Sequence, residues 1–302
     1  MSLLVVGSMA FDSVKTPFGE REGAIGGSAT YFSVSASYFT EVRLVAIVGS
    51  DFPQSELDFL AERSVDLAGL ERSEGETFKW KGEYGFDLNT ARTLDTQLNV
   101  FQDFRPQVPD AFSESEYVFL ANIDPELQAS VVEQVKSPRL VACDTMNFWI
   151  EGKRDELVKT FGMVDMVVIN EGEVRELAGE SNVLKASRKI IEMGPSTLVV
   201  KQGEYGALLI QKDSVFSAPG LLLEDIYDPT GAGDTFAGGF MGYLSSEEDM
   251  SDASLRRAVI FGSVMASFNV ESFSYDRLRV LTQTEIETRY RQFSDLASFD
   301  RI

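Results

Sequence analysis

Short apolar runs rich in Val, Ile and Leu recur along the chain, separated by stretches with helical periodicity. Continuous apolar runs are typical of strands buried on both faces, and their alternation with helices is typical of a parallel sheet. The sequence therefore predicts an α/β fold with a doubly wound, mainly parallel sheet flanked by helices. The predicted strands are residues 3–6, 43–48, 117–121, 140–143, 163–169 and 197–201, and the predicted helices are residues 53–64, 126–135, 182–193 and 254–268.

Two segments interrupt this alternation, residues 11–35 and residues 75–104. The second has β-type residues with partial period-2 alternation, which favours strands outside the main sheet. Because both insertions lie in the N-terminal third, we expect a small β lid over the strand ends where doubly wound sheets bind ligands. Two surface hairpins without a function are the alternative. The whole chain, residues 1–302, is predicted to form a single domain that carries this lid.

The charge balance restricts the possible partners. The chain has 27 Lys and Arg against 48 Asp and Glu, a net charge of −21, and no cluster of basic residues. Such a field repels nucleic acids and anionic membrane surfaces, so we expect neither as a partner. A small anionic ligand must be held by local backbone dipoles. No apolar run reaches the roughly 18 residues of a membrane span. A saline habitat is another explanation of the acidity.

The sequence contains no histidine and one cysteine, Cys143. This excludes Ser-His-Asp and Cys-His catalysis, histidine-bound metals and an intramolecular disulfide. Proton transfer must use a carboxylate, the thiol, a lysine or a tyrosine, and any metal must be a hard ion bound by oxygen. The first residues lack the features of a signal peptide, so the cytoplasm is the expected location.

Residues 228–240 form the most informative segment, Asp-Pro-Thr-Gly-Ala-Gly-Asp followed by an apolar helix. The small residues Gly231, Ala232 and Gly233 allow backbone N–H groups to converge on an anion at the start of that helix. Asp234 would lie beside the anion, where a carboxylate can accept a proton from an attacking hydroxyl. A tight turn with an ordinary dipole-compensating Asp is the alternative.

Residues 228–240 resemble the C-terminal motif of the ribokinase-like (PfkB) family of carbohydrate and nucleoside kinases. Gly26-Gly27-Ser28-Ala29-Thr30 resembles the Gly-Gly turn of the N-terminal motif. Residues 6–12, 170–173 and 201–206 match further elements in order and spacing, so the resemblance spans nearly the whole chain. It implies a kinase that transfers the γ-phosphoryl group of ATP to a hydroxymethyl group of a sugar or nucleoside.

The resemblance assigns roles around the phosphoryl group. It implies that Gly231, Ala232 and Gly233 form the anion hole and that Asp234 is the base. A helix N-terminus and a bound cation should lower the pKa of Asp234. It also implies that Asp12, Gly26 and Gly27 contact the acceptor.

Metal and nucleotide sites follow from the same resemblance. Asn170 and Glu173 are expected to organise Mg²⁺, partly through water, although the pair also has the spacing of a helix cap. Asp228 and Thr230 are candidates for holding a monovalent cation such as K⁺. The expected nucleotide-binding residues are Lys201, Gly203, Gly206 and Asn269, although the two glycines also suit a simple hairpin.

The acceptor site departs from the family pattern, because Tyr31 stands where the family usually has an Asn that binds sugar hydroxyls. Tyr31, together with Phe78, Trp80 and Tyr84 of the lid, offers aromatic surface that suits a base or another large acceptor. Packing of the lid on the body, or on a second lid in a homodimer, explains the same residues, and we expect a homodimer through the lid.

Asp144 and Asn147 follow a predicted strand and should face the site, with no assigned role. No dinucleotide-binding or Walker-type glycine motif is present. A catalytically inactive sugar or nucleotide sensor on the same fold is the alternative function. The sequence does not select the acceptor among sugars and nucleosides.

Overall fold

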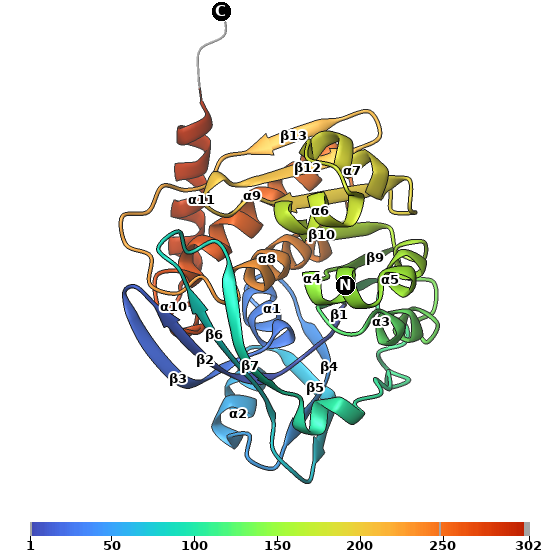
Figure 1. Cartoon of the computed structure of the whole chain (residues 1–302), viewed down its shortest axis with the longest axis vertical. Coiled ribbons are helices and arrows are strands. Elements are labelled where there is room, and N and C mark those ends of the chain that lie inside the picture. The colour runs from blue at the N-terminus through green and yellow to red at the C-terminus, as the bar shows by residue number, and fades with distance from the viewer. Residues whose placement is uncertain (1, 248, 299–302) are drawn as a thin grey trace, which may run out of the picture.

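A nine-stranded sheet forms the centre of the computed structural model, which describes residues 2–247 and 249–298 (Figure 1). The strand order is β13-β12-β11-β10-β9-β8-β1-β4-β5. Neighbouring strands are parallel except in the pairs β11–β12 and β12–β13, which are antiparallel. Every predicted strand is present, while β5, β12 and β13 were not predicted. The bounds are β1 (Leu3–Val6), β4 (Val42–Gly49), β5 (Val65–Ser73), β8 (Tyr117–Leu120), β9 (Leu140–Cys143), β10 (Met166–Asn170), β11 (Thr197–Lys201), β12 (Ala207–Gln211) and β13 (Val215–Ala218).

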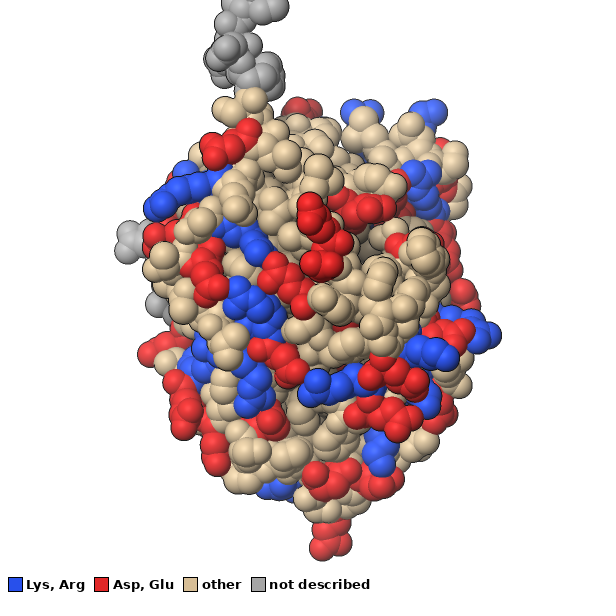
Figure 2. All heavy atoms as spheres, turned by 90° about the vertical axis from the view of Figure 1, so that its left-hand side faces the viewer, with Lys and Arg blue, Asp and Glu red and all other residues tan. Residues whose placement is uncertain are grey.

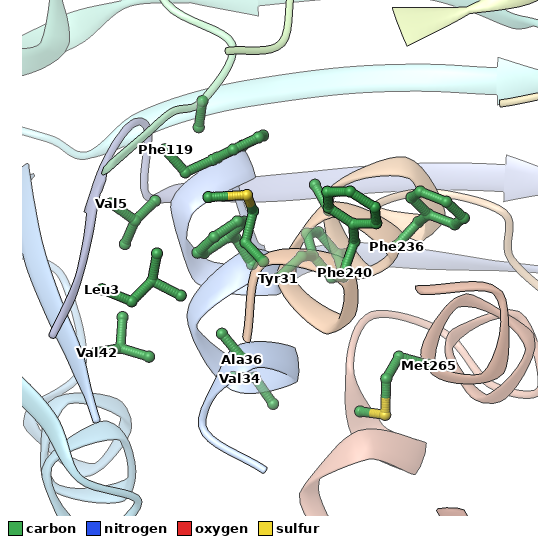
Figure 3. Close-up of a cluster of buried hydrophobic side chains, with 14 of the residues drawn as sticks. Leu3, Val5, Tyr31, Val34, Ala36, Val42, Phe119, Phe236, Phe240 and Met265 are labelled. Carbon is green, nitrogen blue, oxygen red and sulfur yellow. The ribbon is translucent and has the colours of Figure 1, made fainter. Parts of the chain in front are cut away.

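Helices cover both faces of this sheet and create two cores. Leu3 and Val5 of β1 point into one core and Leu4 and Val6 into the other, as the period-2 geometry of a strand requires. Figure 3 shows part of the first core. The helices of the first core are α1 (Ser28–Ala36), α2 (Gln54–Glu62), α8 (Ala232–Ser246), α9 (Asp252–Asn269), α10 (Asp276–Arg279) and α11 (Gln283–Ala297). Those of the second are α3 (Pro125–Val132), α4 (Asn147–Gly152), α5 (Arg154–Phe161), α6 (Glu171–Ala178) and α7 (Val183–Ile191).

A separate four-stranded sheet, the lid, stands beside the main sheet (Figure 1). Its order is β3-β2-β6-β7, from β2 (Ala10–Thr16), β3 (Gly19–Gly26), β6 (Phe78–Tyr84) and β7 (Ala91–Gln97). The first insertion is shorter than predicted: residues 28–35 belong to α1, whose residues are all buried and pack against α8. The second insertion also contains the short helix η1 (Asn99–Asp103), where Phe101 stacks on Phe78 at 5.4 Å.

The direction in which the chain crosses the sheet reverses between β1 and β8. From β1 it proceeds to β4 and β5, and from β8 it proceeds through β9, β10 and β11. Loops that leave the carboxyl ends of two such strands diverge and open a crevice, which is the usual ligand site of an open α/β sheet. The fold therefore places the site near the loops after β1, β8, β9, β10 and β11.

The surface carries mixed charge on the face that Figure 2 presents. Lys and Arg side chains are interspersed there with Asp and Glu and form no continuous basic area. Among the helices in the described part of the chain, none is both long and apolar enough to cross a membrane.

Candidate active site

The turn before α8, residues 231–233, presents the start of a long helix to the crevice, and we call it the anion turn after its expected role. Gly231 occupies the N-cap position with φ +73°, and no side chain caps the helix. The N–H groups of a first helical turn have no partner within the helix, so they favour an anion. A Cβ atom on Gly231 would lie 2.4 Å from the ring of Tyr31, so this position requires glycine for space as well as conformation.

Lys201, the last residue of β11, lies directly beside this turn. A Cβ atom on Gly233 would be 3.0 Å from its Nζ atom. The same Nζ atom lies 2.9 Å from Oδ2 of Asp144, which follows β9. Burial alone would lower the pKa of Lys201, but Asp144 and Glu173 outweigh burial and raise it. The ammonium group therefore keeps its charge next to the N-terminus of α8, where both features attract an anion.

Asp234 lies in the first turn of α8, and its pKa differs from the expectation. Burial, reinforced by Asp144, raises the pKa to about 7, while Lys201 and a backbone N–H group lower it. The expected lowering by the helix N-terminus is thus smaller than the cost of removing the carboxylate from water. With a pKa near neutrality, Asp234 is a stronger proton acceptor than an ordinary aspartate.

Asn170 and Glu173 form a complete capping box at the start of α6. Asn170 Oδ1 accepts the N–H of Glu173 at 2.9 Å, and the N–H of Asn170 donates to Glu173 Oε2 at 3.0 Å. The helix-cap interpretation is therefore confirmed. Burial and the nearby Asp144 raise the pKa of Glu173 to about 7, although Lys201 lowers it.

The donor set limits how a metal ion can be held. Within residues 2–247 and 249–298, no group of three or more His, Cys, Asp or Glu side chains is close enough to bind a metal. The carboxylates near Lys201 supply hard oxygen donors of the type that Mg²⁺ prefers, and Mg²⁺ usually keeps several waters and binds substrate phosphates. The residues present fit a Mg²⁺ ion that arrives with a nucleotide.

Asp12 of the lid strand β2 is buried and lies very close to Gly26 of the neighbouring strand β3. A Cβ atom on Gly26 would be 1.8 Å from Asp12 Oδ2, so a larger residue would displace the carboxylate. Burial raises the pKa of Asp12 to about 7; the Gly27 N–H lowers it, and Asp228 and Asp234 raise it further. The fold thus brings Asp12 and Asp234 into one electrostatic environment, although they are far apart in the sequence.

Tyr31 lies in α1 with only 1% of its surface exposed. Its ring contacts the anion turn as described above and meets Tyr275 edge-on, with centroids 6.2 Å apart. Burial, followed by the charges of Asp12 and Asp228, raises the pKa of its hydroxyl group. The Tyr31 side chain therefore lies close to Gly231 and within the electrostatic influence of Asp12, while its contact with an acceptor stays a prediction.

Asp228 and Asn269 hold the anion turn from behind. The carboxylate of Asp228 accepts the N–H of Thr230 at 2.9 Å and that of Ser274 at 3.1 Å. Asn269 donates to the carbonyl of Thr230 at 2.8 Å and accepts from Thr235 at 3.1 Å. The side chain of Asn269 is completely buried, so it cannot contact adenine in this structure and supports the turn instead. A monovalent cation at Asp228 and Thr230 stays a prediction.

Gly203 and Gly206 form the turn between β11 and β12, immediately after Lys201. Both have positive φ angles, +58° and +103°, and the N–H of Gln202 donates to the carbonyl of Gly206 at 2.8 Å. The hairpin interpretation is confirmed, because β11 and β12 are antiparallel. Their contact with a nucleotide stays a prediction, but the turn continues directly from the Lys201 side of the anion turn.

Sequence reasoning missed two partners of these residues. Asp144 was expected near the site without a role, and it proves to be the ion-pair partner of Lys201. Asn147 is exposed at the start of α4. Tyr84 of the lid accepts a hydrogen bond from Thr230 at 3.3 Å. Its place at the end of an aromatic lid strand was the only signal for this contact.

Comparison with known proteins agrees with this geometry. Residues 4–277 match the family described as pfkB family carbohydrate kinase. A cytidine kinase of Thermococcus kodakarensis is 29% identical over 246 residues, which cover 80% of this chain and 87% of the relative. A nucleoside kinase of Methanothermobacter thermautotrophicus is 27% identical over 289 residues, 89% of each chain. The crystal structure of Methanocaldococcus jannaschii nucleoside kinase, an archaeal member of the ribokinase family, has the same fold, with a TM-score of 0.77 at 21% identity and coverage of 96% and 98%.

Proposed function

The chain belongs to the pfkB family of carbohydrate kinases, and on this premise we propose that it transfers the γ-phosphoryl group of ATP to a hydroxymethyl group of a nucleoside. The observation that carries the proposal is the cluster of Gly233, Lys201 and Asp234 at the start of α8. An uncapped helix N-terminus and a buried ammonium group stabilise negative charge on a transferring phosphoryl group, and a carboxylate with a raised pKa receives the proton.

In this proposal Asp234 accepts the proton of the acceptor hydroxyl as the new O–P bond forms and the bond to the ADP leaving group breaks. Backbone N–H groups around Gly231 to Gly233 stabilise the phosphoryl oxygens. Lys201 adds a fixed positive charge, and Asp144 keeps its ammonium group in place. Asn170 and Glu173 would hold Mg²⁺, partly through water, and the ion would supply positive charge against the nucleotide phosphates.

The aromatic inner face of the lid supports a nucleoside rather than a simple sugar as the acceptor. Asp12 of β2 and Trp80 of β6 are directly paired in the parallel register, so both side chains leave the same face of the lid. The indole ring covers Gly82, where a Cβ atom would lie 2.2 Å from it, and its Nε1 atom donates to Thr93 at 3.2 Å. Asp12 is suited to ribose hydroxyls, and the flat ring of Trp80 is suited to a base.

Two relatives that span most of this chain, a cytidine kinase and a nucleoside kinase, support the same acceptor class. An inositol 3-kinase spans 96% of the chain at 23% identity, so inositol belongs in the test. The test is ADP release from MgATP with cytidine, inosine and adenosine, compared with ribose, fructose and myo-inositol. We expect at least one nucleoside to exceed ribose in kcat/KM by about tenfold or more, because the base adds binding energy to that of the sugar.

The Trp80→Ala variant should remove most of this preference by raising the KM for the nucleoside, while the KM for ATP stays unchanged. A higher kcat/KM for ribose, fructose or inositol would identify a sugar or cyclitol kinase instead. ATP binding without ADP release for any acceptor would favour the inactive sensor.

A further inference from the structure

The tip of the β6–β7 hairpin lies against the turn after β11, although the two segments are far apart in the sequence. Asn89, at the end of this tip, places its Oδ1 atom 2.5 Å from where a Cβ atom of Gly203 would stand. Gly203 adopts φ +58°, so both its conformation and this neighbour favour glycine. The lid therefore reaches beyond the acceptor site to the turn that follows Lys201.

The same hairpin also touches the anion turn. Tyr84, the last residue of β6, accepts the hydrogen bond of Thr230 at 3.3 Å, next to Gly231. Lys201 lies between the two contact points, since it neighbours Gly233 on one side and precedes Gly203 on the other. The hairpin thus contacts both ends of the path that runs from the anion turn to the Gly203 turn.

The tip of the hairpin is largely exposed to solvent. Phe86 is 90% exposed, so this large apolar side chain does not attach the tip to the body. Asn89 approaches Gly203 through its Oδ1 atom, and Lys201, two residues before Gly203, lies close to the carboxylates of Asp144, Glu173 and Asp234. An uncharged carboxamide brings two N–H donors to such a place without adding negative charge.

We propose that Asn89 is part of the nucleotide site and donates its Nδ2–H groups to the polyphosphate of the bound nucleotide. The proposal rests on the proposed kinase function, since that function places the polyphosphate along the path from Gly231 to Gly203. A chain with a net charge of −21 must supply phosphate donors locally, and the hairpin tip supplies one from outside the main sheet.

The test uses the full chain and three variants, Asn89→Ala, Asn89→Asp and, as a matched control on the same lid, Gln97→Ala. The dissociation constant of MgATP is measured by titration calorimetry without acceptor, and the KM values for ATP and for the acceptor are measured separately. Hydrogen bonds to charged groups are the strong ones, so Asn89→Ala should weaken MgATP binding about fivefold or more. Asn89→Asp should weaken it further, because a carboxylate repels the phosphates. Gln97→Ala should stay within about twofold of the wild type, and the acceptor KM should change little in all three.

The outcomes separate this inference from the proposed function. Wild-type protein that fails to bind MgATP contradicts the kinase function itself. Wild-type protein that binds MgATP, with Asn89→Asp binding equally well, overturns the role of Asn89 and leaves the kinase function intact. Tighter binding by Asn89→Ala also overturns it, since the contact with Gly203 would then compete with the nucleotide. Asn89 and Gln97 are both exposed, so their substitution should not unfold the protein, and melting curves verify that each variant remains folded.

Discussion

Lys201 and Asp144 form an ion pair of 2.9 Å beneath the anion turn, with 15% and 6% of their side chains exposed. The two residues are far apart in the sequence. Lys201 ends β11 and Asp144 follows β9, and β10 lies between these two strands in the parallel sheet. Because the pair is almost buried, each charge depends on the other, and the positive charge is held where a phosphoryl group would bind.

Removing one member of this pair should destabilise the protein. Lys201→Met leaves the Asp144 carboxylate buried without its partner, which typically costs about 3–5 kcal/mol. The double variant Lys201→Met with Asp144→Asn should recover most of that stability, yet it should remain inactive because the charge beside Gly233 is gone. Urea denaturation and ADP release measure the two effects. A double variant with wild-type turnover would show that Lys201 has only a structural role.

Asp234→Asn should lower kcat by about 10²–10⁴-fold, which is the usual range for loss of a general base. Affinity for MgATP should change little, because the backbone N–H groups and Lys201 are retained. Asp95→Asn, on the lid strand β7, is the control and should keep wild-type turnover. The assignment of the base fails if Asp234→Asn retains more than about a tenth of wild-type kcat at saturating substrates.

The same substitution should stabilise the ligand-free protein at alkaline pH. The pKa of Asp234 is raised from 3.8 to about 7 in the folded state, so folding becomes less favourable as the pH rises between these values. Asn does not titrate, and one pKa unit corresponds to about 1.4 kcal/mol. The stability gain of Asp234→Asn should therefore grow by about 1–3 kcal/mol from pH 5 to pH 8. Chemical denaturation at both pH values measures it, and a gain independent of pH would contradict the raised pKa.

Glu173 allows its capping and metal roles to be separated. Glu173→Gln can keep the capping box, since Gln serves at this position as well as Glu, whereas Glu173→Ala loses the side-chain bond to the Asn170 N–H. We expect Glu173→Gln to keep the melting temperature but to need more Mg²⁺ for half-maximal rate. Glu173→Ala should lose about 0.5–2 kcal/mol of stability in addition. An unchanged Mg²⁺ requirement in Glu173→Gln would leave Glu173 as a helix cap alone.

The outer face of the lid should pair with a second copy of the chain. Phe11, Lys79 and Lys81 line a groove on this face together with Asp95 and Gln97. Sedimentation at tens of micromolar protein should show a homodimer, and Lys81→Glu should weaken it through like-charge repulsion with the acidic partner surface. A monomer at that concentration, in the wild type, would contradict pairing through the lid.

The sequence alone determined the elements whose signal is local. Buried strands such as β1 and β8 are short apolar runs, and the Asn170–Glu173 capping box is a local pairing at fixed spacing. The anion turn at Gly231 was predicted for the same reason, since small residues before a helix create the turn by themselves. The doubly wound architecture followed from the alternation of these elements.

Only the tertiary structure decided which distant residues meet. The first lid insertion was predicted too long because the polar and small residues of α1 carry no strong helical signal, and their burial against α8 assigns them to the body. The raised pKa values of Asp12 and Asp234 come from burial and from distant carboxylates, Asp228 and Asp234 for Asp12 and Asp144 for Asp234, which no local pattern encodes. Lys201 meets Asp144 because pairing of the strands brings their ends together, and Asn89 meets Gly203 because the lid packs beside the main sheet. Such long-range contacts depend on the whole fold and not on any one stretch of sequence.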